Sequence, residues 1–255
     1  MILERSVQLA RVPDVETPTI RWQGLYRLAG AAALATVALT LAAVFAHIAW
    51  TPPGWAPGAA IHWFTRFQES WLLGLLGLDL VIVSGLVASV PIFLALYVAL
   101  RPAGESAMAI ATALALLGTV LHLVSNTAFE MLSLSQGYAA ATTEAQRAAL
   151  LAAGEAKLAS YYGTAFHVSY VLGYVAKLMI GAVMLRSAAF GKATAYTGIL
   201  AGIVGLGFYL PTIGLFISIL SVLFIATWNV LVARDLFQLA RGAVIAKRPA
   251  GNGRY

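Results

Sequence analysis

The sequence predicts an all-α membrane protein, a single polytopic bundle of six transmembrane helices with both termini in the cytoplasm. Composition is the first observation: 61% of the residues are hydrophobic, 10% are charged and the mean hydropathy is +0.86. Soluble domains are only about half apolar and about a quarter charged. The second and third observations are that long apolar runs recur along the chain and that cations gather in alternate connections between them.

Six apolar runs approach or exceed the roughly 20 residues that a helix needs to cross a bilayer. They are 28–50, 71–100, 106–134, 161–185, 193–210 and 212–232. The second run is longer than a bilayer requires, which leaves open a tilt, a kink at Pro91 or an extension past the membrane. The last two runs are separated by Pro211. We predict two helices there, because proline disfavours helical geometry at the preceding residue and a combined helix would exceed any membrane thickness.

The positions of the cations predict the orientation. With six alternating spans, most Lys and Arg residues fall on one side, Arg66, Arg147 and Lys157 fall on the other, and Lys177 lies within a span. The majority comprises Arg5, Arg11, Arg21, Arg27, Arg101, Arg186, Lys192, Arg234, Arg241, Lys247, Arg248 and Arg254. By the positive-inside rule both termini are cytoplasmic. The chain is then one membrane domain, with a cytoplasmic segment 1–24, a six-helix bundle 25–241 and a cytoplasmic tail 242–255.

The first residues lack the apolar core of a cleavable signal peptide, so the first span is expected to stay as an anchor.

Two outer segments are longer than turns. The segment 51–70 carries Trp55 and Trp63 among prolines and predicts an irregular loop with aromatic side chains at headgroup level. The segment 142–160 opens with Thr143 and Gln146, the spacing of a capping box, which predicts an outer helix.

Several function classes are excluded or disfavoured. The chain has no cysteine, which excludes disulfides, thiolate metal sites and iron–sulfur clusters. The alternating cations report topology rather than a basic face, so nucleic acid is not expected as a partner. No nucleophile elbow or phosphate-binding loop is present. We therefore predict no cofactor and the lipid bilayer as the partner, with a small-molecule or cation ligand and homo-oligomerisation left open. Gly198 and Gly202 form a GxxxG pair that allows close helix packing.

A polar ladder inside the third apolar run is the most informative functional feature. His122, Asn126 and Glu130 are spaced four apart, which would place their side chains on one stripe of a continuous helix. An ionisable residue within a membrane span is costly, so it is by default a functional-site hypothesis.

Depth counting selects the members of the predicted site. At about 1.5 Å per residue, Glu130, His167, Asn126 and Asp79 lie about 6 to 12 Å below the outer surface, whereas His122 lies about 18 Å and Lys177 about 25 Å below it. The predicted ligand or proton-pathway site is therefore Asp79, Asn126, Glu130 and His167, with His122 as its floor or as packing. Lys177 is expected to snorkel toward the cytoplasmic interface, with Asn229 as its alternative partner.

Three functions are compatible with these residues. The leading hypothesis is a small transporter-like or ligand-binding bundle with this polar site in the outer half of the membrane, and no catalytic residue is assigned. The first alternative is a metal-dependent intramembrane enzyme with His122, His167, Glu130 and Asp79 as ligands, although the chain has no HxxxH, HExxH or ExxH pattern. The second is a structural or assembly subunit in which the same residues hydrogen-bond between helices.

Four stretches of the chain are RLAG at 27–30, PIFLALYVALRP at 91–102, MLRS at 184–187 and TGILAG at 197–202. In these stretches the chain resembles bacterial multipass membrane proteins classed only as a domain of unknown function. The resemblance implies a six-helix fold in a bacterial inner membrane. It implies no reaction and no catalytic residue.

Overall fold

The computed structural model describes residues 22–50 and 58–242, and these residues are helical with no strand. Four helical stretches within this part are long and apolar enough to cross a membrane. They are Gln23–Phe45, Leu80–Ala140, Glu144–Met184 and Phe216–Ala240. The predicted all-α fold is confirmed for the described residues, and the four stretches are consistent with the predicted membrane protein. The predicted cytoplasmic segments 1–24 and 242–255 lie almost wholly outside the described residues.

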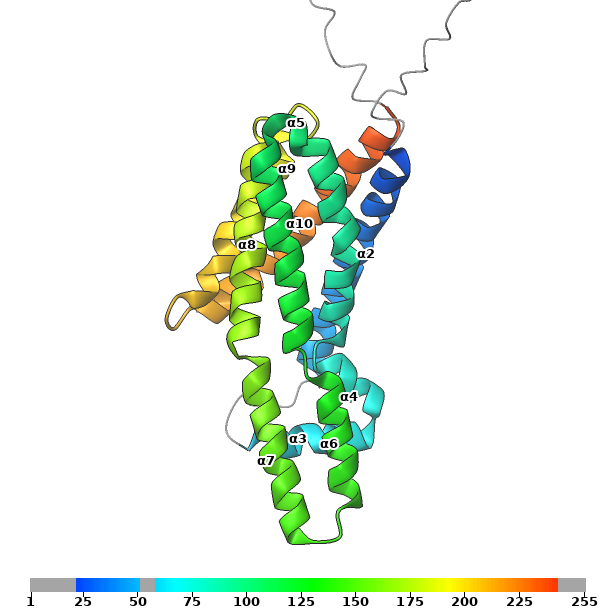
Figure 1. Ribbon diagram of the computed structural model, residues 1–255, viewed down its shortest axis with the longest axis vertical. Coiled ribbons are helices and arrows are strands. Elements are labelled where there is room, and N and C mark those ends of the chain that lie inside the picture. Colours follow the sequence, from blue (N-terminus) through cyan, green and yellow to red (C-terminus); the bar gives the residue numbers. More distant parts are fainter. Residues whose placement is uncertain (1–21, 51–57, 243–255) are drawn as a thin grey trace, which may run out of the picture.

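The long helices form one bundle (Figure 1). It consists of α2 (Gln23–Trp50), α5 (Leu80–Ser125), α8 (Thr164–Met184), α9 (Lys192–Leu206) and α10 (Gly214–Ala240). Within α5 the backbone leaves helical geometry at Gly104, and the two halves of α5 run in opposite directions on either side of it. The predicted second and third runs meet at this reversal. A short 3-10 turn, η1 (Gly207–Tyr209), precedes Pro211, so the predicted separation of the last two runs is confirmed.

Four further helices form a second body at the end opposite the start of α2 and the end of α10 (Figure 1). We call them the distal lobe: α3 (Ala59–Glu69), α4 (Trp71–Gly77), α6 (Ala128–Ala140) and α7 (Glu144–Tyr161). The predicted capping box begins α7 as expected. The predicted irregular loop is wrong over Ala59–Glu69, which is the helix α3. Its apolar side chains recur on one face, so Trp63, Phe64 and Phe67 are buried within the lobe instead of lying at a headgroup surface.

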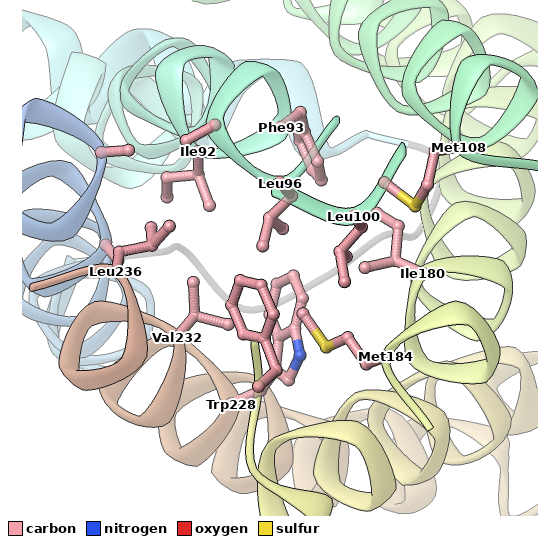
Figure 2. Packing of buried hydrophobic residues seen from close by; sticks show 14 of the residues in the cluster. Ile92, Phe93, Leu96, Leu100, Met108, Ile180, Met184, Trp228, Val232 and Leu236 are labelled. Atoms are coloured by element: carbon pink, nitrogen blue, oxygen red, sulfur yellow. The ribbon is translucent and has the colours of Figure 1, made fainter. Parts of the chain in front are cut away.

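The bundle core lies between α2, both halves of α5, α8 and α10 (Figure 2). Leu96 and Leu100 on α5, Ile180 on α8 and Trp228 on α10 point toward one another there, each at most 2% exposed. α9 closes the bundle through small residues. A Cβ atom at Gly198 would lie 2.7 Å from Trp228 Nε1 and one at Gly202 would lie 2.5 Å from Leu178 Cγ. The GxxxG pair therefore packs against helices of the same chain.

The distal lobe has a hydrophobic core of its own, built from Trp63, Phe64 and Phe67 on α3, Leu75 on α4 and Met131 on α6, with others. Polar side chains join its helices. The Glu155 carboxylate on α7 accepts a hydrogen bond from the Ala60 amide at 2.8 Å, which satisfies a free donor in the first turn of α3. On α6, the Ser135 hydroxyl donates to the Phe64 carbonyl at 2.9 Å. The lobe is thus a packed unit rather than a set of turns.

Candidate functional site

The ladder of His122, Asn126 and Glu130 is interrupted in the structure. α5 ends at Ser125, Asn126 adopts an extended conformation, and α6 begins at Ala128. The prediction of one continuous helix through all three residues is therefore wrong. The Asn126 side chain explains the break, because its Oδ1 accepts a hydrogen bond from the Ala128 amide at 3.1 Å, a local bond that competes with helical geometry.

Two of the predicted site residues, Asp79 and Asn126, do come together. Asn126 Nδ2 donates to the Leu78 carbonyl at 2.9 Å. Asp79 follows directly, in a left-handed conformation with φ 62° that Asp tolerates better than most residues. The Tyr161 hydroxyl, at the end of α7, donates to the Asp79 carboxylate. We call the meeting point of residues 78–79, 126–127 and 161–163 the junction, because each of the three chain segments passes there between the distal lobe and the bundle.

The contacts at the junction favour a structural role for Asp79 and Asn126. Tyr161 is fully buried, and its ring stands edge-on to that of Tyr162 at 4.4 Å between centroids. A buried hydroxyl that donates to a carboxylate is a strong link between its two helices, since hydrogen bonds to charged groups are stronger than neutral ones. Sequence reasoning missed Tyr161. The signal available was a pair of adjacent tyrosines before Gly163, at the boundary of an apolar run.

Glu130 does not join Asp79 and Asn126. It lies on the first turn of α6, where its carboxylate is 3.6 Å from the ammonium of Lys157 on α7. The side chains of Glu130 and Lys157 are 48% and 44% exposed. Glu130 therefore does not share a site with Asp79, as was predicted. It forms an exposed ion pair between two helices of the distal lobe.

The rings of His122 and His167 both lie near one aromatic ring, that of Phe166. His122 Nδ1 lies 3.3 Å from the Ser169 hydroxyl, and its Nε2 is buried without a hydrogen-bond partner among the described residues. The Phe166 ring is 5.8 Å from the His122 ring and 5.3 Å from the His167 ring, between centroids. Within 22–50 and 58–242, no three His, Asp or Glu side chains form a group that could hold a metal ion. The alternative ligand set His122, His167, Glu130 and Asp79 is thus not assembled.

His167 instead pairs with Tyr209, a residue that sequence reasoning did not select. His167 is exposed on the first turn of α8, and its Nδ1 lies 3.2 Å from the Tyr209 hydroxyl in η1. The same hydroxyl donates to the His167 carbonyl at 3.2 Å. The two bonds fasten η1 to the start of α8. The signal for Tyr209 was its place two residues before the helix-breaking Pro211.

A shallow groove lies beside this pair. Its cavity volume is about 330 Å³, and it is lined by His167, Val168, Val171, Leu172 and Tyr209. Three of these residues are aliphatic, no Asp, Glu, Lys or Arg lines the groove, and the surface that the groove exposes is almost entirely apolar. Such a lining suits an apolar molecule.

The secondary residues are also separated. The Lys177 ammonium lies 5.2 Å from the centre of the Tyr174 ring, three residues nearer the start of α8. It is therefore directed away from the end of α8 toward which it was predicted to snorkel. Asn229 is buried, and its Nδ2 donates to the Ile225 carbonyl one turn earlier in α10 at 3.0 Å. The predicted pairing of Lys177 with Asn229 is not formed.

A buried carboxylate near the opposite end of the bundle was also missed. Asp235 on α10 is 3% exposed. Its Oδ2 accepts hydrogen bonds from the Thr194 hydroxyl at 2.6 Å and the Gly191 amide at 3.2 Å, and its Oδ1 accepts from the Arg234 guanidinium at 2.8 Å. Asp235 thus binds Gly191 and Thr194 at the start of α9 and ties α9 to α10.

Comparison with known proteins leaves these contacts to be interpreted on their own chemistry. No family model, no curated protein and no solved structure matches the chain.

Proposed function

We propose that the chain is a six-span protein of the bacterial cytoplasmic membrane with both termini inside. The stretch Leu80–Ala140 reverses at Gly104, so it supplies two crossings rather than one. α9 has 15 residues, which with η1 reach about 28 Å, close to the roughly 30 Å of a bilayer core. The start of α2 and the end of α10 lie together, because a Cβ atom at Gly30 would be 2.9 Å from the Phe237 ring. An even number of crossings accounts for this, and the cation bias supports an interior location.

The distal lobe then lies outside the membrane. The stretch Glu144–Met184 has 41 residues, and 41 helical residues span about 61 Å, roughly twice the bilayer core. α8 accounts for the crossing, so α7 extends past it. The groove beside His167 lies at the start of α8, in the outer half of the span.

The function that the contacts support best is binding of a lipid-phase ligand in this groove. The observation that carries the proposal is the lining itself, an almost wholly apolar wall to which Val168, Val171 and Leu172 contribute aliphatic side chains. A molecule entering from the bilayer would keep its apolar chain against these side chains. This keeps the predicted ligand-binding function and the predicted residue His167, and moves the site away from Asp79 and Glu130.

The structural or assembly-subunit alternative is also supported by particular contacts. Asp79 with Tyr161, Asn126 with the Leu78 carbonyl, and Asp235 with Thr194 each join two elements of this chain. Such bonds stabilise a bundle whether or not it binds a ligand. The two functions differ at the groove, which a purely structural subunit does not need.

Photolabelling in lipid nanodiscs tests the proposal. The probes are two hexadecyl chains bearing a diazirine and an alkyne, one ending in a hydroxyl and the other in a methyl ether. We expect labelling of the segment 167–172 that excess unlabelled hexadecanol suppresses. Val171→Trp fills the groove and should remove most of this labelling. Val230→Trp is the matched control, because Val230 is 45% exposed on α10 and does not line the groove.

The proposal fails if neither probe gives saturable labelling of 167–172, or if Val171→Trp and Val230→Trp lower it equally. That result would favour the structural subunit. Binding of the purified protein to zinc, iron or copper in stoichiometric amounts would instead support the metal-dependent enzyme.

A further inference from the structure

Lys177 faces the interior of the bundle. Met184 follows it by two helical turns on the same stripe of α8, and Met184 points into the hydrophobic core (Figure 2). Tyr174 and Gly181, one turn to either side of Lys177, face neighbouring helices. The Tyr174 hydroxyl lies 3.3 Å from that of Ser221 on α10, and a Cβ atom at Gly181 would lie 3.0 Å from a carbonyl of α9. Lys177 is thus surrounded by helices of its own chain rather than by lipid.

No carboxylate of the described residues balances the charge of Lys177. None of the four ion pairs among these residues includes it. Asp79 and Asp235 accept hydrogen bonds elsewhere in the fold, and Glu105 is exposed beside the chain reversal. The ammonium contacts the ring of Tyr174, but attraction to a ring offsets only part of the cost of a charge within a membrane. The balancing charge is left to an anion that the described chain does not supply.

Open space lies close to Lys177. The residue keeps part of its surface accessible although it faces inward. Gly173 precedes it by one turn, and a Cβ atom built at Gly173 meets no atom within 4 Å. Gly173 lies where α5 packs on α8, because a Cβ atom at Gly118 would be 3.4 Å from the Gly173 nitrogen. The open space is therefore beside a helix contact within the bundle, one turn from the lysine.

The surroundings of Lys177 favour a small anion with a single charge. Lys177 is one cation, so a doubly charged phosphate or sulfate would remain partly unbalanced. The neighbouring polar side chains are uncharged: the hydroxyls of Tyr170 and Ser218 lie 2.8 Å apart, one turn from the Tyr174–Ser221 pair. No negative side chain of these pairs opposes an anion. Because α5 and α9 approach α8 closely at glycines, an ion of one or a few atoms fits the interior better than a large organic anion.

We propose that the interior of the bundle beside Lys177 is a binding site for a halide ion such as chloride. The ammonium supplies the charge that holds the ion, and the ion balances a cation that is otherwise costly within a membrane. Val168 and Val171, which line the groove, lie on the opposite, exposed face of α8. The halide site is therefore separate from the groove and from the ligand proposed for it.

Thermal unfolding in a neutral detergent, followed by circular dichroism at constant ionic strength, tests the site. Chloride replaces gluconate, a larger organic anion. We expect the wild-type Tm to rise by about 3 to 6 °C at about ten times the dissociation constant of chloride. Lys177→Met keeps the length of the side chain without its charge, so it should be at least as stable as the wild type in gluconate and should show no rise in chloride. Lys157→Met is the matched control and should keep the rise, because Lys157 already has Glu130 as its partner.

Bromide can locate the ion without any substitution. Anomalous diffraction from crystals of the wild-type protein grown in bromide should show a peak beside the Lys177 ammonium. The proposal is overturned if bromide appears only beside exposed cations such as Arg241, or if chloride raises the Tm of the wild type and of Lys177→Met equally. Neither result depends on labelling of 167–172, so the halide site and the groove can fail separately.

Discussion

Asp235 illustrates at the residue scale how this chain accommodates a charged side chain within its helix packing. The carboxylate is buried, yet it accepts hydrogen bonds from Thr194, Gly191 and Arg234. A buried carboxylate is tolerated only when it is paired and hydrogen-bonded in this way. Its neighbours are distant in sequence, except for Arg234, so spacing along the chain did not reveal it.

Removing the Thr194 hydroxyl should destabilise the link between α9 and α10. We expect Thr194→Val to lower the free energy of unfolding by about 1 to 3 kcal/mol, because it takes one donor from a buried charged group while keeping the side-chain shape. Thermal unfolding followed by tryptophan fluorescence in detergent measures the change. Thr197→Val is the control, since the hydroxyl of the half-buried Thr197 donates to the carbonyls of Ala193 and Thr194 in its own helix. Equal effects of the two substitutions would contradict this role for Asp235.

At the scale of single elements, the sequence predicted most helices but not the end of α5 at Ser125. Hydropathy located α8, α9 and α10, and the capping box located the start of α7. Hydropathy extended the predicted third run past Asn126. It is averaged over a window, and one Asn–Thr pair does not lower that average enough to end the run. The break depends on Asn126 bonding to Ala128 and to Leu78, and Leu78 lies 48 positions away.

The glycines of α8 and α9 allow a test of packing between these two helices. Gly202→Ala should destabilise the protein by about 1 to 3 kcal/mol, since its Cβ would lie 2.5 Å from Leu178 Cγ and 3.1 Å from the Tyr174 carbonyl. Gly173→Ala on α8 is the matched control. A Cβ there has nothing within 4 Å, so the substitution should be neutral or stabilising by about 0.5 to 1 kcal/mol.

Chemical denaturation in mixed micelles measures both changes. The role of Gly202 in packing α9 onto α8 would be contradicted if Gly202→Ala left the free energy of unfolding unchanged but dissociated an oligomer. The GxxxG pair would then serve contacts between chains.

For the whole molecule, sequence reasoning did not predict how the polar residues are grouped. Asp79 and Asn126 meet at the junction, whereas Glu130 faces Lys157 and His167 faces Tyr209. Depth counting gives one coordinate, height in the membrane. Position around the bundle depends on the break at Asn126 and on the reversal at Gly104, and neither is encoded in depth. The four residues predicted at similar height are therefore distributed over three separate contacts.

The junction couples the distal lobe to the bundle, so weakening it should loosen the lobe as a unit. Tyr161→Phe keeps the buried ring and removes the hydroxyl that donates to Asp79. We expect it to cost about 1.5 to 3 kcal/mol, the range for a hydrogen bond to a charged group. Hydrogen–deuterium exchange in nanodiscs should then rise across α3, α6 and α7, and change little in the halves of α5 and in α10, whose core lies on the other side of the junction.

Glu130→Gln is the control for this prediction. The Glu130–Lys157 pair joins α6 to α7 within the lobe and is about half exposed, so its loss should cost at most about 1 kcal/mol. Exchange should therefore rise only locally, near those two side chains. If Glu130→Gln raised exchange across the whole lobe as much as Tyr161→Phe does, the surface ion pair rather than the junction would stabilise the lobe. That result would contradict the structural role of Asp79.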